Sequence, residues 1–141
     1  MSLPTAAPAP RAAPAPRSRE YHHEPLELEL SEYPDFRSER SYVFTPVVVP
    51  GGPDVEVDVY RRVGDARVLD VFLGIDIGST STKAVLMAPD HAVLAGFYTR
   101  TTGRPLAAMQ RILEAIDHLA RCQDSELVVR AAGTTGSGRK F

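Results

Sequence analysis

The chain has 141 residues, of which 43% are hydrophobic, and its formal net charge is −2. The charge excludes a polycation that binds nucleic acid and also an acidic tail. The single cysteine, Cys122, excludes a disulfide framework within the chain. No apolar run is long enough to cross a bilayer, and the N-terminus lacks the apolar core of a signal peptide. We therefore expect a cytoplasmic protein with no nucleic-acid or membrane partner.

Residues 1–20 form the first of three predicted segments. They contain five of the twelve prolines, and the sequence A-P-A-P-R occurs twice. Alternating Ala and Pro favour an extended chain without internal hydrogen bonds, which predicts a disordered or polyproline-like tail. A transit peptide is a weaker alternative, supported by Arg and Ser residues and by the absence of acids before Glu20.

Residues 21–69 predict a strand-rich lead-in whose role the sequence does not reveal. Residues 26–30 and Val55–Val59 alternate between apolar and polar side chains, which is typical of half-buried strands. Residues 47–49 are a short apolar segment between two prolines. The Pro-Gly-Gly-Pro cluster that follows, residues 50–53, predicts a turn.

A stretch of mostly apolar residues, 71–87, is interrupted by one carboxylate and one polar turn. Residues 71–77 are nearly all apolar apart from Asp76, which predicts a strand buried on both faces. Residues 84–87 predict the next strand. Only residues 78–83 separate the two strands, so the simplest geometry is an antiparallel hairpin with a polar turn.

The polar turn has a chemical use. Gly78 lets the backbone bend and lets a ligand approach closely. Amides and hydroxyls of the turn can form a cluster of donors for phosphate oxygens, and Lys83 adds a cation. Asp76 can hold a hydrated Mg²⁺ or orient a water; the alternative is an incidental acid beside an ordinary turn. The four hydroxyl residues of the turn are Ser79, Thr80, Ser81 and Thr82.

The remaining elements predict the fold class. Residues 92–98 predict a third strand, and apolar residues at three- and four-residue steps predict a helix over Pro105–Cys122, with Glu114 and His118 solvated on its outer face. Residues 127–132 predict a fourth, buried strand. The order strand, strand, strand, helix, strand is the opening of a ribonuclease-H-like α/β subdomain, in which three antiparallel strands are followed by a crossover to a parallel one.

The fourth strand leads into a second glycine-rich segment, residues 133–141. Three glycines in six residues indicate a loop that needs close approach or positive φ. Its place at the carboxyl end of a strand is where open α/β sheets bind ligands, although a plain surface loop is the alternative. The residues expected to line the ligand cleft are Gly136, Ser137, Gly138 and Arg139.

The sequence G-I-D-I-G-S-T-S-T-K-A-V-L, residues 74–86, resembles the first phosphate motif of a large superfamily. That superfamily unites actin, heat-shock chaperones, hexokinase and sugar kinases. The resemblance implies a ribonuclease-H-like fold in which the turn binds the phosphates of ATP. It also implies that Asp76 is the catalytic carboxylate and that it holds Mg²⁺ through a water molecule.

Together with the second loop, the motif resembles one family of this superfamily. Residues 72–141 are similar to the ATPases that activate 2-hydroxyacyl-CoA dehydratases and benzoyl-CoA reductases. In that family the fourth strand ends in a loop usually written A-T-G-Y-G-R, and Ser137 stands here in place of the aromatic residue. Sugar kinases tend to carry a G-x-S-G-Q-type loop, which this chain lacks.

The resemblance implies a function for the whole protein of which residues 70–141 would be the first, truncated part. Family members are homodimers that couple ATP hydrolysis to electron transfer into a dehydratase or reductase partner. They hold one [4Fe–4S] cluster between subunits, with cysteine ligands that this chain does not contain. We expect the 141-residue chain to be inactive alone. The alternatives are a carbohydrate kinase of the same superfamily and a non-catalytic nucleotide-binding interaction module.

Overall fold

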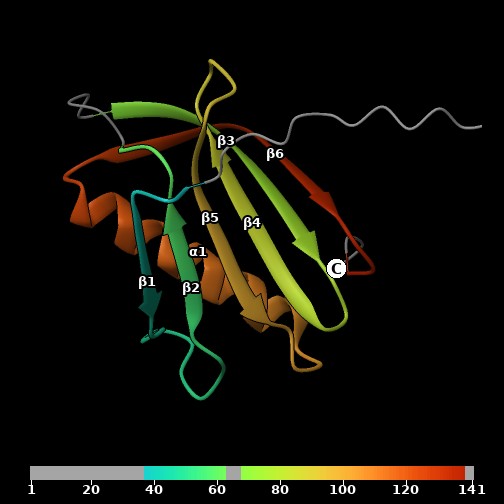
Figure 1. The fold of residues 1–141 in the computed structure, drawn as a ribbon. Coiled ribbons are helices and arrows are strands. Elements are labelled where there is room, and N and C mark those ends of the chain that lie inside the picture. The colour runs from blue at the N-terminus through green and yellow to red at the C-terminus, as the bar shows by residue number, and fades with distance from the viewer. Residues whose placement is uncertain (1–36, 63–67, 139–141) are drawn as a thin grey trace, which may run out of the picture. The chain divides into compact units, whose positions relative to one another are not determined.

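The computed structural model describes residues 37–62 and 68–138, and these residues form an α/β domain with a mixed sheet and one helix (Figure 1). The predicted tail, the alternating segment 26–30, Arg139 and Lys140 lie outside the described residues. The elements in chain order are β1 (Arg40–Phe44), β2 (Val55–Val59), β3 (Val68–Ile77), β4 (Ser81–Met87), β5 (Val93–Arg100), α1 (Pro105–Cys122) and β6 (Glu126–Thr135).

The six described strands lie in the order β1-β2-β5-β4-β3-β6. The predicted hairpin is present, with β3 antiparallel to β4 and β4 antiparallel to β5. Strand β6 pairs with β3 in parallel, after the crossover through α1. Strands β1 and β2, from the predicted lead-in, continue the same sheet beyond β5.

Only one face of the sheet is covered by α1 (Figure 1). Val71, Leu73 and Ile75 of β3 are buried on the helix side, whereas Phe72 and the side chains that alternate with them are partly exposed on the other. The prediction that this strand is buried on both faces is therefore wrong. The strand is apolar at nearly every position, but among the described residues only one face of the sheet is covered, by α1.

Strand β6 differs more strongly from the prediction of a buried strand. Most of its residues are exposed, including Val129 at 47% relative exposure. Strand β6 is the last strand in the described sheet order, so only one of its edges is paired. An apolar sequence predicts a strand, but the strand is buried only where other parts of the protein cover it.

Helix α1 has the predicted bounds, and Ile112, Ile116 and Leu119 of its apolar stripe are buried as expected, but the buried face is shifted from the predicted one. Its buried side chains include Ala108, Ile112 and Ala115, whereas Leu106 and Leu113 are 51% and 41% exposed. The packed face therefore combines alanines, which let the helix backbone approach the strands closely, with the larger side chains of Ile112, Ile116 and Leu119. No helix among the described residues has the length and apolar character needed to cross a membrane.

Glu114, expected in solvent, is partly exposed but has partners that the sequence did not predict. Its carboxylate accepts hydrogen bonds from the backbone amides of Val47 (2.6 Å), Val48 (3.0 Å) and Val49 (3.4 Å). These three residues form bends and not a strand. One side chain of α1 therefore accepts hydrogen bonds from three successive backbone amides, in a segment that does not pair with a strand.

Replacing Glu114 by Gln will remove an acid-sensitive contribution to stability. Desolvation raises the pKa of Glu114, but the three amide hydrogen bonds outweigh it and hold the pKa below its ordinary value of 4.5. The contribution is therefore complete above about pH 4.5 and is lost as the pH falls through the lowered folded-state pKa. Urea unfolding should show a gap between wild type and Glu114→Gln near neutral pH that closes in acid. Asp117→Asn, which breaks an exposed pair with Arg121 on the same helix, should show little gap at any pH.

The inward and outward positions of α1 can be compared directly. Ile112→Ala will lower the free energy of unfolding by about 2–5 kcal/mol, because it opens a cavity at a residue with no exposed surface. Leu113→Ala removes a side chain of similar size from the outer face and should cost less than about 1 kcal/mol. Equal losses in urea titrations would contradict the observed helix orientation.

Candidate functional site

Asp76 lies where three strands meet. On β3 it is paired with Lys83 of β4 and, on the other side, with Thr135 of β6. Its side chain is half-buried on the face that α1 does not cover. Within the described ranges its carboxylate has no hydrogen-bond or ion-pair partner. It is therefore available to a ligand.

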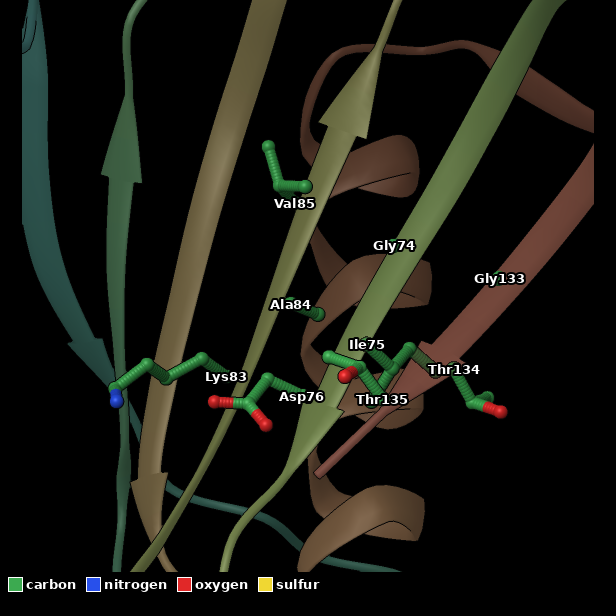
Figure 2. A pocket seen from close by; sticks show the side chains of 9 residues that line it. All are labelled: Gly74, Ile75, Asp76, Lys83, Ala84, Val85, Gly133, Thr134 and Thr135. Carbon is green, nitrogen blue, oxygen red and sulfur yellow. The ribbon is translucent and has the colours of Figure 1, made fainter. Parts of the chain in front are cut away.

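A hollow of about 390 Å³ lies beside this carboxylate. Figure 2 shows Asp76 and Thr135 close together on neighbouring strands, and the Lys83 side chain extending away from Asp76. Two glycines, one on β3 and one on β6, leave room on the floor of the hollow. The lining residues are Gly74, Ile75, Asp76, Lys83, Ala84, Val85, Gly133, Thr134 and Thr135.

The turn after Asp76 is shorter than predicted. Strand β4 begins at Ser81 and not at residue 84, so only residues 78–80 connect the two strands. The Gly78 amide donates to the Ser81 carbonyl (3.0 Å), and a Cβ on Gly78 would lie 2.6 Å from that oxygen. Ser79 and Thr80 are exposed at the tip, where their hydroxyls and amides can meet a ligand.

Thr82 takes a different place from the one predicted. Its side chain is fully buried, and its hydroxyl shares a 3.0 Å hydrogen bond with the hydroxyl of Thr101. Thr101 in turn donates to the Gly78 carbonyl (2.7 Å), and its amide donates to the Thr80 carbonyl (2.9 Å). The Thr82 hydroxyl therefore stabilises the turn from the buried side of the sheet, and it is not accessible to a phosphate.

Thr101 is a residue that the sequence reasoning missed. It ties the loop after β5 to the hairpin, and it is 1% exposed. Nothing in its local sequence distinguishes it from the other threonines, because its role comes from the pairing of β4 with β5. Only the tertiary structure could have identified it.

The second glycine-rich loop lies directly against the end of β3. Gly136 has φ +89°, and a Cβ there would lie 2.5 Å from Oδ1 of Asp76 and from the carbonyl oxygen of Ile77. The Gly138 amide donates to that same carbonyl (2.9 Å). The second loop thus contacts the end of β3 that leads into the hairpin turn, and Gly136 lies beside the Asp76 carboxylate. Ser137 is exposed between the two glycines, and the predicted Arg139 lies outside the described residues.

A second hollow, of about 330 Å³, lies beside the hairpin turn. Its walls come from both glycine loops, from the loop after β5 and from the first residue of α1. The unpaired amides at a helix start attract anions. The lining residues are Gly78, Ser79, Thr101, Gly103, Pro105, Ser137 and Gly138.

The geometry suits a polyphosphate with a divalent cation. No cluster of three or more His, Cys, Asp or Glu side chains capable of holding a metal occurs among residues 37–62 and 68–138. A cation at Asp76 would therefore take its other ligands from water and from a bound phosphate, as Mg²⁺ commonly does. Glycines at the contact points let the backbone of both loops approach such a ligand.

Comparisons of the chain with protein-family models, with curated proteins and with solved structures find no match. No relative therefore supplies a function by similarity of the whole chain. The functional interpretation depends on the motif residues and on the geometry around Asp76.

Three glycines allow the contact at Asp76 to be tested. Gly136→Ala will destabilise the fold by about 1–3 kcal/mol, because it combines a positive φ with a clash against Asp76 and Ile77. Gly103→Ala, with φ +69° and open space around it, should cost only the backbone strain of about 1 kcal/mol. Gly133→Ala has neither feature and should be nearly neutral. Thermal unfolding that ranked the three variants in another order would contradict the placement of the loop.

Proposed function

We propose that residues 70–141 are the phosphate-binding part of a ribonuclease-H-like ATPase domain. The observation that carries this proposal is the contact of residues 136–138 with the end of β3, where Gly136 faces Asp76 and the Gly138 amide bonds to Ile77. An unpartnered carboxylate beside two glycine loops could hold a hydrated Mg²⁺ while the loop backbones approach a polyphosphate.

The strand order supports the proposed fold family. Strands β3, β4 and β5 form an antiparallel meander, and α1 then returns the chain so that β6 lies parallel to β3. This is the order expected for the opening of a ribonuclease-H-like subdomain. It brings the carboxyl ends of β3 and β6 to one edge of the sheet, where ligands of α/β proteins bind.

Each part of the site has a role in the proposal. Asp76 would hold hydrated Mg²⁺ and orient water, while Ser79, Thr80 and the amides of the turn would bind phosphate oxygens. Gly136 and Gly138 would line the opposite wall. Lys83 lies near the same hollow but points away from the carboxylate, so it would reach an anion only after a change of rotamer.

The resemblance to dehydratase and reductase activases extends the proposal to the whole protein. In that case ATP hydrolysis would drive electron delivery to a partner enzyme, from a homodimer. The [4Fe–4S] cluster of that family takes four thiolates, and this chain has one cysteine. The residues of this chain therefore do not fit such a cluster.

Nucleotide titrations followed by amide NMR will test the proposal on the full 141-residue chain. Adding ATP with Mg²⁺ should shift the amide signals of Gly78, Gly136 and Gly138, and the apparent affinity should fall about tenfold without Mg²⁺. Asp76→Asn should remove the dependence on Mg²⁺. Asp70→Asn is the matched control, because Asp70 lies at the far end of the same strand and pairs with Arg130.

Two results would contradict the proposal. The first is the same binding of ATP by Asp76→Asn as by wild type, with an unchanged response to Mg²⁺. The second is a set of shifts that avoids both glycine loops. Separately, ATP turnover by residues 1–141 alone would contradict our expectation that this chain is inactive by itself.

A further inference from the structure

The two edge strands of the described sheet differ in length and in composition (Figure 1). Strand β1 has five residues and begins with Arg40. Strand β6 has ten residues, contains no lysine or proline, and is exposed at most of its positions. A free strand edge is normally protected by shortness, by lysine or proline, or by a covering segment. Within residues 37–62 and 68–138, the outer edge of β6 has none of these three protections.

The outer edge of β6 offers two kinds of interaction to another strand. The first is its backbone, because an edge strand carries N–H and C=O groups that bind an added strand. The second is apolar contact, since Val129 of β6 and Val68 at the start of β3 are both exposed. The one charge in the middle of the strand, Arg130, is neutralised by Asp70 of β3, whose Oδ1 lies 2.9 Å from its Nε. This charge therefore does little to repel a partner.

The sequence of the first half of β6 shows which strand fits this edge. Glu126 and Arg130 lie two positions before and two positions after Val128, and Leu127 and Val129 lie between them. In an antiparallel pair of two β6 strands centred on Val128, each Glu126 lies opposite an Arg130 of the other copy. Each Leu127 likewise lies opposite a Val129. Opposite charges and apolar side chains in directly opposed positions stabilise antiparallel strands.

Arg130 can bind both carboxylates in this arrangement. Its ion pair with Asp70 is made through Nε. A guanidinium has five N–H donors, so the terminal nitrogens remain for Glu126 of the second copy. The segment 126–130 is therefore complementary in charge to a second copy of itself.

A break in the register of β6 limits the extent of this pairing. Val129 is paired with Val71 of β3, but Ala131 is paired with Phe72, so Arg130 is an extra residue in a β-bulge. A bulge bends its strand and interrupts the ladder. In the register centred on Val128, residues beyond the bulge would face residues 121–125 of the second copy, which are not a strand. The glycine loop after β6 is therefore left outside the paired segment.

We infer that the outer edge of β6 is a dimerisation edge, at which a second copy of this chain adds its own β6 in the antiparallel register centred on Val128. The two sheets become one continuous sheet about a two-fold axis, and this closed symmetry leaves no free β6 edge for further growth. Because the paired segment is short, the dimer is weak and exchanges rapidly. It does not depend on the proposed nucleotide function.

Sedimentation equilibrium of the full 141-residue chain will test the dimer. A reducing buffer keeps the exposed thiol of Cys122 from forming a crosslink between copies. The average mass should rise from that of the 15.3 kDa monomer towards twice that value as the protein concentration is raised to about 1 mM. A chain that stays monomeric over this range would overturn the inference, whether or not another protein binds the edge.

Two charge reversals test the register. Glu126→Arg places Arg opposite Arg in the homodimer, and Arg130→Glu places Glu opposite Glu. Each should weaken association by about tenfold or more, because two attractive pairs become repulsive. An equal mixture of the two variants should associate nearly as well as wild type, since every Arg in the mixed dimer faces a Glu. Glu56→Arg is the matched control, because it makes the same change of charge at an exposed position of the inner strand β2.

Val128→Lys provides a test that leaves the Asp70–Arg130 pair intact. It places two ammonium groups at the two-fold axis and should abolish association, while circular dichroism shows that the chain is still folded. Dimers that survive both Val128→Lys and Glu126→Arg would place the interface elsewhere and would overturn the inference. Charge-reversed variants that each weaken the dimer but do not rescue one another when mixed would overturn the antiparallel register, and the inference with it.

Discussion

The parallel pairing of β6 with β3 is the constraint on which the site depends. Parallel neighbours cannot be joined by a tight turn, so the chain must cross over the sheet between them, and α1 is that crossover. Because the two strands run in the same direction, their carboxyl ends arrive at the same edge. Asp76, near the end of β3, is therefore placed beside the loop that follows β6. If the strands ran antiparallel, the two glycine loops would lie at opposite ends of the sheet and could share no ligand.

The helix fixes a second property, the difference between the two faces of the sheet. Its alanines and Ile112 pack closely on one face and bury the alternate residues of β3, β4 and β5. The remaining residues of the same strands stay partly open, and Asp76 is one of them. A carboxylate on the helix side would be desolvated and would need a partner from within the protein. On the open side it keeps access to water, which is the condition for holding a hydrated cation.

Helix α1 also separates two regions of different chemistry. Its start at Pro105 adjoins the glycine loops, and its last turn carries His118 and Cys122 against β1. Between them, Glu114 holds the amides of residues 47–49. Sequence patterns cannot distinguish these residues from solvated helix positions, whereas the contacts of each residue in the structure do. The inward-facing residues of α1 pack against the sheet. The residues beside them make polar contacts, and these contacts differ between the two ends of the helix.

The sequence by itself determined the order of the elements from β3 to β6, the hairpin, the bounds of α1 and the two glycine loops. These features depend on local periodicity and on glycine, whose effects extend over a few residues. It could not place β1, because five residues without clear alternation become a strand only when β2 offers a partner. It also assigned Thr82 to the phosphate turn and two strands to full burial. Burial and hydrogen-bond partners are set by what lies across the sheet, often dozens of residues away in sequence, so only the tertiary structure decided them.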